Sequence, residues 1–236
     1  MISLIVPAHN EQRVIGATLG ALHGAAGALQ VSYEIIVVDD ASSDRTAEVA
    51  AAHGARVVSV EHRHIAAARN AGAARARGDR LVFVDADTRI GTAVLEAAIG
   101  AMQAGAIGGG AAVRLLGPLA WHERLAVAVS VRLFRAARIA PGCFVFCTRS
   151  GFEAAGGFDE SYYAGEDVAI SRALARHGRF VILRQAVRTS PRKLRTFSLA
   201  EHLRLLVAFA WRGRGMLKSR QHLDFWYGKR RDQDQP

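Results

Sequence analysis

The chain is organised around Leu81-Val82-Phe83-Val84-Asp85-Ala86-Asp87-Thr88, where four apolar residues lead into two carboxylates one residue apart. An apolar run without polar alternation is typical of a strand that is covered on both faces. The C-terminal edge of such a sheet is the usual place for a ligand crevice. Two aspartates at that edge repel each other unless a positive group lies beside them. The pair therefore indicates either a divalent cation with a bound diphosphate or a simple turn in which Asp caps a helix.

Strands and helices alternate in the first half of the chain. Apolar runs predict strands at 2–6, 33–38, 57–60 and 81–84, and the segments between them predict helices at about 13–29, 46–53 and 65–77. This alternation predicts an α/β fold with a mostly parallel central sheet flanked by helices. Polar or acidic clusters follow three of the strands, at 7–11, 39–44 and 85–87. Parallel strands bring these clusters to one edge, which favours a binding site there.

Beyond Asp87 the alternation loosens. We expect helices at about 92–104, 118–138 and 168–177, with strands through 113–115, at 143–147 and at 180–183. The helix at 118–138 has an apolar stripe at four-residue spacing, made of Trp121, Leu125, Val129 and Leu133, and four arginines on its other side. We favour a core helix with a solvated basic face over a helix that lies on a membrane surface, although the composition permits both.

Basic residues are concentrated at the C-terminal end. The net charge of the 236 residues is +10, of which residues 1–183 contribute +1 and residues 184–236 contribute +9. Such an end attracts polyanions, either nucleic acid or an anionic membrane surface. We expect residues 1–195 to form one domain and residues 196–236 to form a basic helical extension packed on or beside it, because Ser198-Leu199-Ala200-Glu201 is a capping box.

Nothing in the sequence predicts a membrane span or a leader. No segment has the roughly 18 consecutive apolar residues that a membrane span needs. The first residues, Met1-Ile2-Ser3-Leu4-Ile5-Val6-Pro7, have no basic region before the apolar run and read as a core strand rather than as a signal peptide. We therefore expect a cytoplasmic protein, with the basic end favouring a peripheral position on the cytoplasmic face of the membrane.

Five short motifs in the expected order resemble those of the family 2 glycosyltransferases, which have the A-type nucleotide-sugar-binding fold. They are Ile5-Val6-Pro7-Ala8-His9-Asn10-Glu11, Val37-Val38-Asp39-Asp40-Ala41-Ser42-Ser43-Asp44, Ala68-Arg69-Asn70-Ala71-Gly72, Phe83-Val84-Asp85-Ala86-Asp87, and Gly156-Gly157-Phe158-Asp159-Glu160 with Gly165-Glu166-Asp167. The resemblance covers roughly residues 1–190. It implies that residues 1–195 are a glycosyltransferase catalytic domain.

The resemblance also assigns roles to single residues. It implies that Pro7, Ala8, Asn10 and Glu11 line the nucleotide pocket and that Asp40 accepts hydrogen bonds from the base. Arg69 is expected near the pocket floor or the phosphates, and Asp85 and Ala86 are expected at the sugar or ribose. Asp87, with Asp85, is expected to hold the Mn²⁺ or Mg²⁺ ion that bridges the diphosphate. Asp167 matches the catalytic base, with Glu166 beside it; from the residues alone, Asp167 could equally cap the following helix.

These roles agree with the chemistry of sugar transfer. A metal ion neutralises the leaving diphosphate, and a carboxylate takes the proton of the attacking hydroxyl. The resemblance implies a single inverting displacement by a hexosyltransferase-like enzyme. Two features depart from the family pattern: residues 187–192 lack the histidine that often completes the metal site, and the Gln-x-x-Arg-Trp motif of processive members is missing. Transfer of a single sugar is therefore expected.

Two alternatives remain open. A sugar-nucleotide nucleotidyltransferase also needs a nucleotide pocket and carboxylates, but Pro7 to Glu11 has no glycine- and lysine-rich phosphate loop. A non-catalytic module that binds membranes or polyanions would use the basic end and would leave the acidic clusters unexplained. The expected partners are a nucleotide-sugar donor, a hydroxyl acceptor that is lipid-linked or a glycan, and an anionic membrane surface rather than nucleic acid. The oligomeric state stays open.

Overall fold

The computed structural model describes residues 1–117 and 121–190, without the side chains of residues 121–127 and 130. The expected basic extension, residues 196–236, lies outside the described residues, so its helix and its packing stay predictions. The first half of the chain contains β1 (Ile2–Ala8), α1 (Ile15–Ala28), β2 (Tyr33–Asp40), α2 (Thr46–Ala52), β3 (Arg56–Val60), α3 (Ile65–Arg75) and β4 (Arg80–Val84). The second half contains β5 (Thr88–Arg89), α4 (Thr92–Gln103), β6 (Ala106–Leu115), α5 (Trp121–Ala137), β7 (Phe144–Thr148), α6 (Arg149–Ala154), α7 (Glu166–His177) and β8 (Arg179–Thr189).

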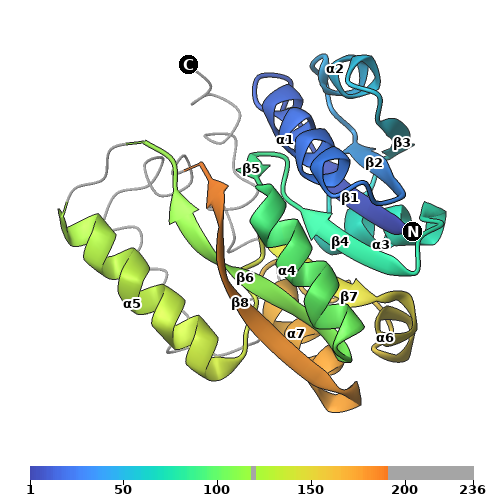
Figure 1. Ribbon diagram of the computed structural model, residues 1–236. Coiled ribbons are helices and arrows are strands. Elements are labelled where there is room, and N and C mark those ends of the chain that lie inside the picture. Colours follow the sequence, from blue (N-terminus) through green and yellow to red (C-terminus); the bar gives the residue numbers. More distant parts are fainter. Residues whose placement is uncertain (118–120, 191–236) are drawn as a thin grey trace.

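Within the described residues, the strands form one sheet in the order β3-β2-β1-β4-β7-β6-β8-β5 (Figure 1). The first four strands in this order are parallel to one another, and β6 is parallel to β8. β7 is antiparallel to both β4 and β6, and the short β5 is antiparallel to β8. The expected mostly parallel sheet flanked by helices is thus confirmed. The alternation of apolar runs did not indicate that β7 is antiparallel. This strand starts at the edge of the sheet where β6 ends, so it runs in the opposite direction to β6.

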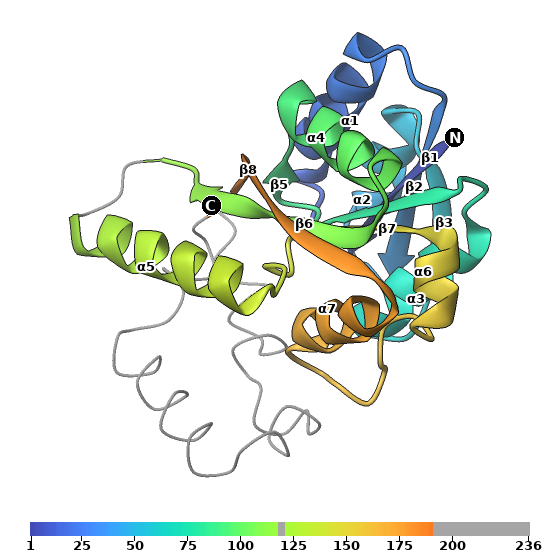
Figure 2. The same ribbon diagram turned by 60° about the horizontal axis from the view of Figure 1, so that its bottom comes forward.

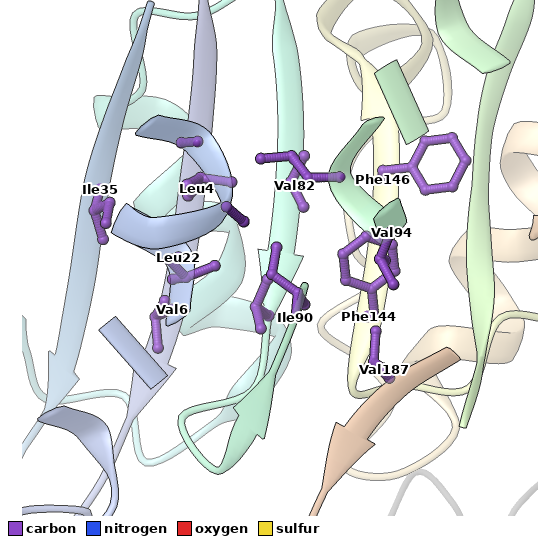
Figure 3. Close-up of a cluster of buried hydrophobic side chains, with 14 of the residues drawn as sticks. Leu4, Val6, Leu22, Ile35, Val82, Ile90, Val94, Phe144, Phe146 and Val187 are labelled. Atoms are coloured by element: carbon purple, nitrogen blue, oxygen red, sulfur yellow. The ribbon is translucent and has the colours of Figure 1, made fainter. Parts of the chain in front are cut away.

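Two apolar layers hold the helices on the sheet. α1 and α4 cover one face, and α3 and α7 cover the other (Figure 2). Strand β4 shows why its sequence lacks polar alternation: Val82 and Val84 pack into the layer with α1 and α4, and Leu81 and Phe83 pack into the opposite layer. Figure 3 shows the first layer, in which Phe144 and Phe146 of β7 lie beside Val82 of β4 and Val94 of α4.

The glycine run of β6 permits a close approach of three strands. A Cβ at Gly109 would collide with the carbonyl oxygen of Val181 in β8 and with the ring of Phe146 in β7. A Cβ at Gly110 would collide with Ala140, in the segment that leads into β7. Only glycine lacks this atom. The run therefore lets β6 lie between two neighbours that would otherwise be pushed apart.

The expected orientation of α5 is wrong. Its apolar stripe was expected to face the core, but Val129 is 45% exposed and Leu133 is 64% exposed. Arg135, expected on a solvated face, donates a hydrogen bond to the carbonyl oxygen of Leu183 in β8. The helix thus rests on β6 and β8 by its other side, where Val131 and Phe134 are partly buried. Among the described residues, no helix combines the length and the apolar character needed to cross a bilayer.

Candidate active site

The polar clusters that follow the strands meet at the C-terminal edge of the sheet. β1 and β2 extend further than expected, because Ala8 pairs with Asp39 and Asp40 pairs with Val60 in β3. A pocket opens at this edge, between the ends of β1 and β4 and the start of α3. Its lining residues are Pro7, His9, Glu11, Ile65, Asp85, Ala86 and Asp87. The structure therefore brings Pro7, Glu11, Asp85, Ala86 and Asp87 together, as the sequence indicated.

Asn10 joins the loop after β1 to the loop after β2. Its backbone is in the left-handed region with φ 54°, a conformation that Asn adopts more readily than most residues. Its side-chain Oδ1 accepts a hydrogen bond from the backbone N–H of Ser43, and its own N–H donates to the hydroxyl of Ser42. The N–H of Glu11 donates to the hydroxyl of Thr46 in the same way. These contacts shape the mouth of the pocket, and Asn10 itself does not line it.

The two aspartates at the end of β2 point to opposite faces of the sheet, because successive strand residues alternate. Asp40, expected to contact a base, is 5% exposed, and its two oxygens accept hydrogen bonds from the backbone N–H groups of Arg63 and His64. It thus holds the loop that starts α3. Asp39 is also buried, and its Oδ1 has no hydrogen-bond partner among the described residues. An unpaired buried carboxylate oxygen is costly, which makes Asp39 a candidate ligand contact that motif matching had not singled out.

Arg69 links the pocket to the start of α7. Its side chain is 1% exposed. The terminal nitrogen Nη2 donates to Asp85 Oδ1 at 2.9 Å and to the carbonyl oxygen of Gly142 at 2.8 Å. The second terminal nitrogen, Nη1, donates to Glu166 Oε1 at 2.8 Å. Its Cζ lies 5.1 Å from the centre of the Phe158 ring. Burial favours the neutral guanidinium, but the neighbouring carboxylates outweigh this effect and raise the pKa of Arg69. Arg69 therefore lies under the pocket and joins α3, β4 and α7.

Asp167 follows Glu166 at the first turn of α7. One of its oxygens accepts a hydrogen bond from the N–H of the next residue, Val168, at 2.9 Å. The N-cap of α7 is Gly165, so Asp167 lies inside the helix and does not cap it. Burial of the carboxyl group raises the pKa of Asp167 to about 7, the charge of Glu166 adds to this rise, and Arg69 opposes it. Its other oxygen would lie 3.0 Å from a Cβ at position 142, so glycine there leaves room for the carboxylate. A carboxyl group with this pKa can accept or donate a proton near neutral pH.

Asp87 lines the pocket. Its Oδ1 lies 3.4 Å from the hydroxyl of Thr189, at the end of β8, and 3.5 Å from that of Thr88. Thr189 was not singled out from the sequence because β5 and β8 pair across 101 positions of the chain. Within residues 1–117 and 121–190, no group of three His, Cys, Asp or Glu side chains is placed to hold a metal.

The oxygens of this edge nevertheless suit a hard cation. Mg²⁺ and Mn²⁺ prefer oxygen ligands, and Mg²⁺ is commonly held by one or two carboxylates together with the phosphates of a substrate. Asp87 offers one such carboxylate beside the pocket. Asp85 offers a second, although its Oδ1 already binds Arg69. The residues present therefore fit a cation that shares its ligands with a bound diphosphate.

The chain is similar to known proteins in sequence and in fold. Residues 3–154 match the family described as glycosyl transferase family 2. The chain is similar to an undecaprenyl-phosphate 4-deoxy-4-formamido-L-arabinose transferase of Edwardsiella ictaluri, with 35% identity over 97 residues, 36% of this chain and 29% of the relative. The chain thus spans less than a third of the length of that relative.

Two solved structures share the fold over most of this chain. The mannosyltransferase PcManGT from Pyrobaculum calidifontis, in complex with GDP-Man and Mn²⁺, matches with a TM-score of 0.65 at 20% identity, covering 89% of this chain and 64% of that one. S. aureus TarS 1-349 in complex with UDP-GlcNAc matches with a TM-score of 0.64 at 16% identity, covering 95% of this chain and 78% of that one. At these identities the likeness concerns the fold alone.

The buried position of Arg69 gives a prediction about stability. Arg69→Met should leave two carboxylates, Asp85 and Glu166, without their cation, and breaking a buried ion pair costs about 3–5 kcal/mol of unfolding free energy. Urea denaturation measures this loss. Arg45→Met is the control, since Arg45 pairs with Glu48 at the surface, and it should leave the midpoint unchanged. Equal midpoints for both variants would show that the bridge does not hold the fold together.

Proposed function

This chain belongs to glycosyl transferase family 2, and we propose that it transfers a single sugar from a nucleotide-diphosphate sugar to a hydroxyl group of an acceptor, with inversion at the anomeric carbon. One observation carries the proposal: Arg69 bridges Asp85, which lines the pocket, and Glu166, which precedes Asp167. The bridge ties the first turn of α7, where the pKa of Asp167 is raised to about 7, to a residue that lines the pocket.

The pocket and the strand ends beside it offer contacts for each part of a donor. The unpaired oxygen of Asp39 can accept an N–H of a nucleobase, next to Ala8 across the strand pair. Asp85 lines the pocket, where its carboxylate can accept hydroxyls of the ribose or the sugar. A nucleotidyltransferase is less well supported, because Pro7 to Glu11 contains neither glycine nor lysine to cradle attacking phosphates.

Asp167 is proposed as the general base. The acceptor hydroxyl attacks the anomeric carbon, its proton passes to the carboxylate of Asp167, and the bond between that carbon and the diphosphate breaks. The nucleoside diphosphate leaves with the electron pair of the broken bond. A base with a pKa near the working pH suits this proton transfer, which typically contributes about 10²–10⁴-fold in rate. Glu166 and Arg69 orient the turn of α7 that carries Asp167.

Asp87, with Asp85, is proposed to hold Mn²⁺ or Mg²⁺ together with the diphosphate. Such an ion, when bound, offsets the charge that develops on the leaving diphosphate. The Mn²⁺ complex of PcManGT supports a divalent ion in a protein of this fold. The threonine hydroxyl at position 189 lies where β8 approaches Asp87. It is proposed to orient the Asp87 carboxylate.

The acceptor is proposed to be lipid-linked. The relative from Edwardsiella ictaluri is named for undecaprenyl phosphate, a lipid whose acceptor group is a phosphate, so it supports a lipid-linked acceptor and does not bear on the hydroxyl. Residues 184–236 of this chain carry a net charge of +9, which an anionic membrane surface attracts. A lipid-linked acceptor and a basic enzyme would meet at that surface. A glycan acceptor in solution is the alternative, and residence in the cytoplasm stays a prediction.

The proposed base gives a pH dependence. Asp167 must be deprotonated to accept a proton, so the turnover rate should rise with pH through a midpoint of about 7. Glu166→Gln removes the negative charge that helps to raise the pKa of Asp167, and the midpoint should move to lower pH. Asp167→Asn should lower turnover by about 10²–10⁴-fold and leave the affinity for the donor unchanged. Rates from pH 5 to 9 and calorimetric titration of the donor measure both effects.

The matched control for Asp167→Asn is Asp79→Asn, because Asp79 lies just before β4, at the opposite edge of the sheet. It should keep full turnover. Full turnover of Asp167→Asn, or a midpoint near the ordinary pKa of a carboxyl group at about 4, would contradict the assignment of the base.

The proposed cation site gives a prediction about ligand binding. Wild-type protein should bind UDP or GDP at least about tenfold more tightly with Mn²⁺ than with EDTA, because a carboxylate of the protein and the diphosphate of the nucleotide bind the same ion. Asp87→Ala should lose this difference, and Asp79→Ala should keep it. Titration calorimetry of the nucleotide with and without Mn²⁺ measures the effect. A difference that persists in Asp87→Ala would place the ion elsewhere.

A further inference from the structure

The outward face of α5 is apolar. Val129 and Leu133 lie one turn apart and are among the three large apolar side chains that are exposed in the described part of the chain, the third being Met1 at the N-terminus. In the sequence, Trp121 and Leu125 precede them at the same four-residue interval. A helix of a globular protein normally turns such a stripe toward the core. In the described part of the helix, Val129 and Leu133 turn outward instead, which indicates a surface that binds something.

Positive charge flanks this face. Arg132 and Arg138 are exposed, and Arg132 lies within one turn of both Val129 and Leu133. The sequence of α5 contains one acidic residue, Glu123, against three arginines. Apolar residues on one face with arginines beside them are the pattern of helices that lie in a membrane interface. The apolar side chains enter the acyl boundary while the arginines meet the lipid phosphates.

Three partners could cover this face: a second copy of the chain, the basic segment 184–236, or an anionic bilayer. Their charges differ, and this difference favours one of them. A second copy of the chain, paired through the same helix, would bring Arg132 and Arg138 against the same residues of its partner. The segment 184–236 carries +9 and would add further positive charge beside them. An anionic bilayer is complementary to the arginines and offers apolar contact. We propose that the outward face of α5, made of Val129, Arg132 and Leu133, docks this protein on an anionic lipid bilayer together with Arg138, which directly follows the helix.

The position of α5 relates this surface to the reaction. Figure 2 shows α5 to one side of the sheet, apart from the helices that cover its two faces. The helix ends at Ala137, and five residues later the carbonyl oxygen of Gly142 accepts a hydrogen bond from Arg69, with Asp167 next to it. Docking through α5 would therefore bring the acceptor side of the site to the bilayer. This last step rests on the proposed function, whereas the docking itself does not.

Vesicle binding of the full-length chain tests the proposal. The wild-type protein should co-sediment with vesicles of phosphatidylglycerol and phosphatidylcholine and bind much less to phosphatidylcholine alone. Val129→Ser/Leu133→Ser should weaken binding by about tenfold or more, since each apolar side chain contributes through the area that it buries. Arg132→Gln/Arg138→Gln should weaken binding and reduce its salt dependence. Arg172→Gln/Arg176→Gln, on the exposed side of α7, is the matched control and should bind as the wild type does.

Three results would overturn the proposal. Val129→Ser/Leu133→Ser could bind vesicles as tightly as the wild type, which would assign docking to the basic residues 184–236. The wild type could bind neutral and anionic vesicles equally, or bind neither. The serine variant could instead convert a dimer into a monomer in size-exclusion chromatography, which would make a second copy the occupant. Unchanged nucleotide binding by the serine variant confirms that it is folded, and turnover with a water-soluble acceptor tests the proposed function separately.

Discussion

Arg69 is a charged side chain held in the interior of the protein, with carboxylates from β4 and α7 on either side of it. A buried cation costs several kcal/mol of desolvation unless its partners are close and well placed. Here Asp85 and Glu166 lie 16 and 97 positions away in the sequence and bind its two terminal nitrogens at 2.9 and 2.8 Å. The start of α7 therefore cannot move away from the end of β4 without exposing the charge. This constraint ties the turn that carries Asp167 to Asp85 in the pocket wall. The charge of Arg69 also keeps the pKa of Asp167 from rising further.

The site is an edge at which strands end, and strand geometry decides what each carboxylate does. Asp39 and Asp40 are adjacent, yet one supports the loop before α3 and the other keeps an unpaired oxygen, because their side chains leave opposite faces of β2. Asp85 and Asp87 are separated by one residue and differ as well. Asp85 is engaged by the buried guanidinium below, while Asp87 contacts hydroxyls from β5 and β8. Four similar side chains thus have four different surroundings.

Much of this arrangement follows from the sequence. The apolar runs predict β1 to β4 and the helices between them, because a strand that is covered on both faces has no polar alternation. The clusters after β1, β2 and β4 predict the edge where the pocket lies. The antiparallel β7 and the pairing of β5 with β8 could not be predicted in this way, since strand direction late in the sheet depends on where α5 returns the chain. The same long-range pairing brings Thr189 to Asp87. The face of α5 was predicted wrongly because periodicity shows that a helix has an apolar side and does not show which way that side turns.

The claim that the Arg69 bridge positions the catalytic base, Asp167, opposite the bound donor is tested most directly by a crystal structure of the protein with a non-transferable nucleotide-sugar analogue and Mn²⁺. We predict that the diphosphate lies against Asp87 and the nucleobase lies next to Asp39. The carboxylate of Asp167 should face the anomeric carbon from the side away from the phosphate, with room for an acceptor oxygen about 3–3.5 Å from that carbon. A donor bound away from the ends of β1 and β4, or one whose anomeric carbon has its diphosphate on the same side as Asp167, would contradict the account.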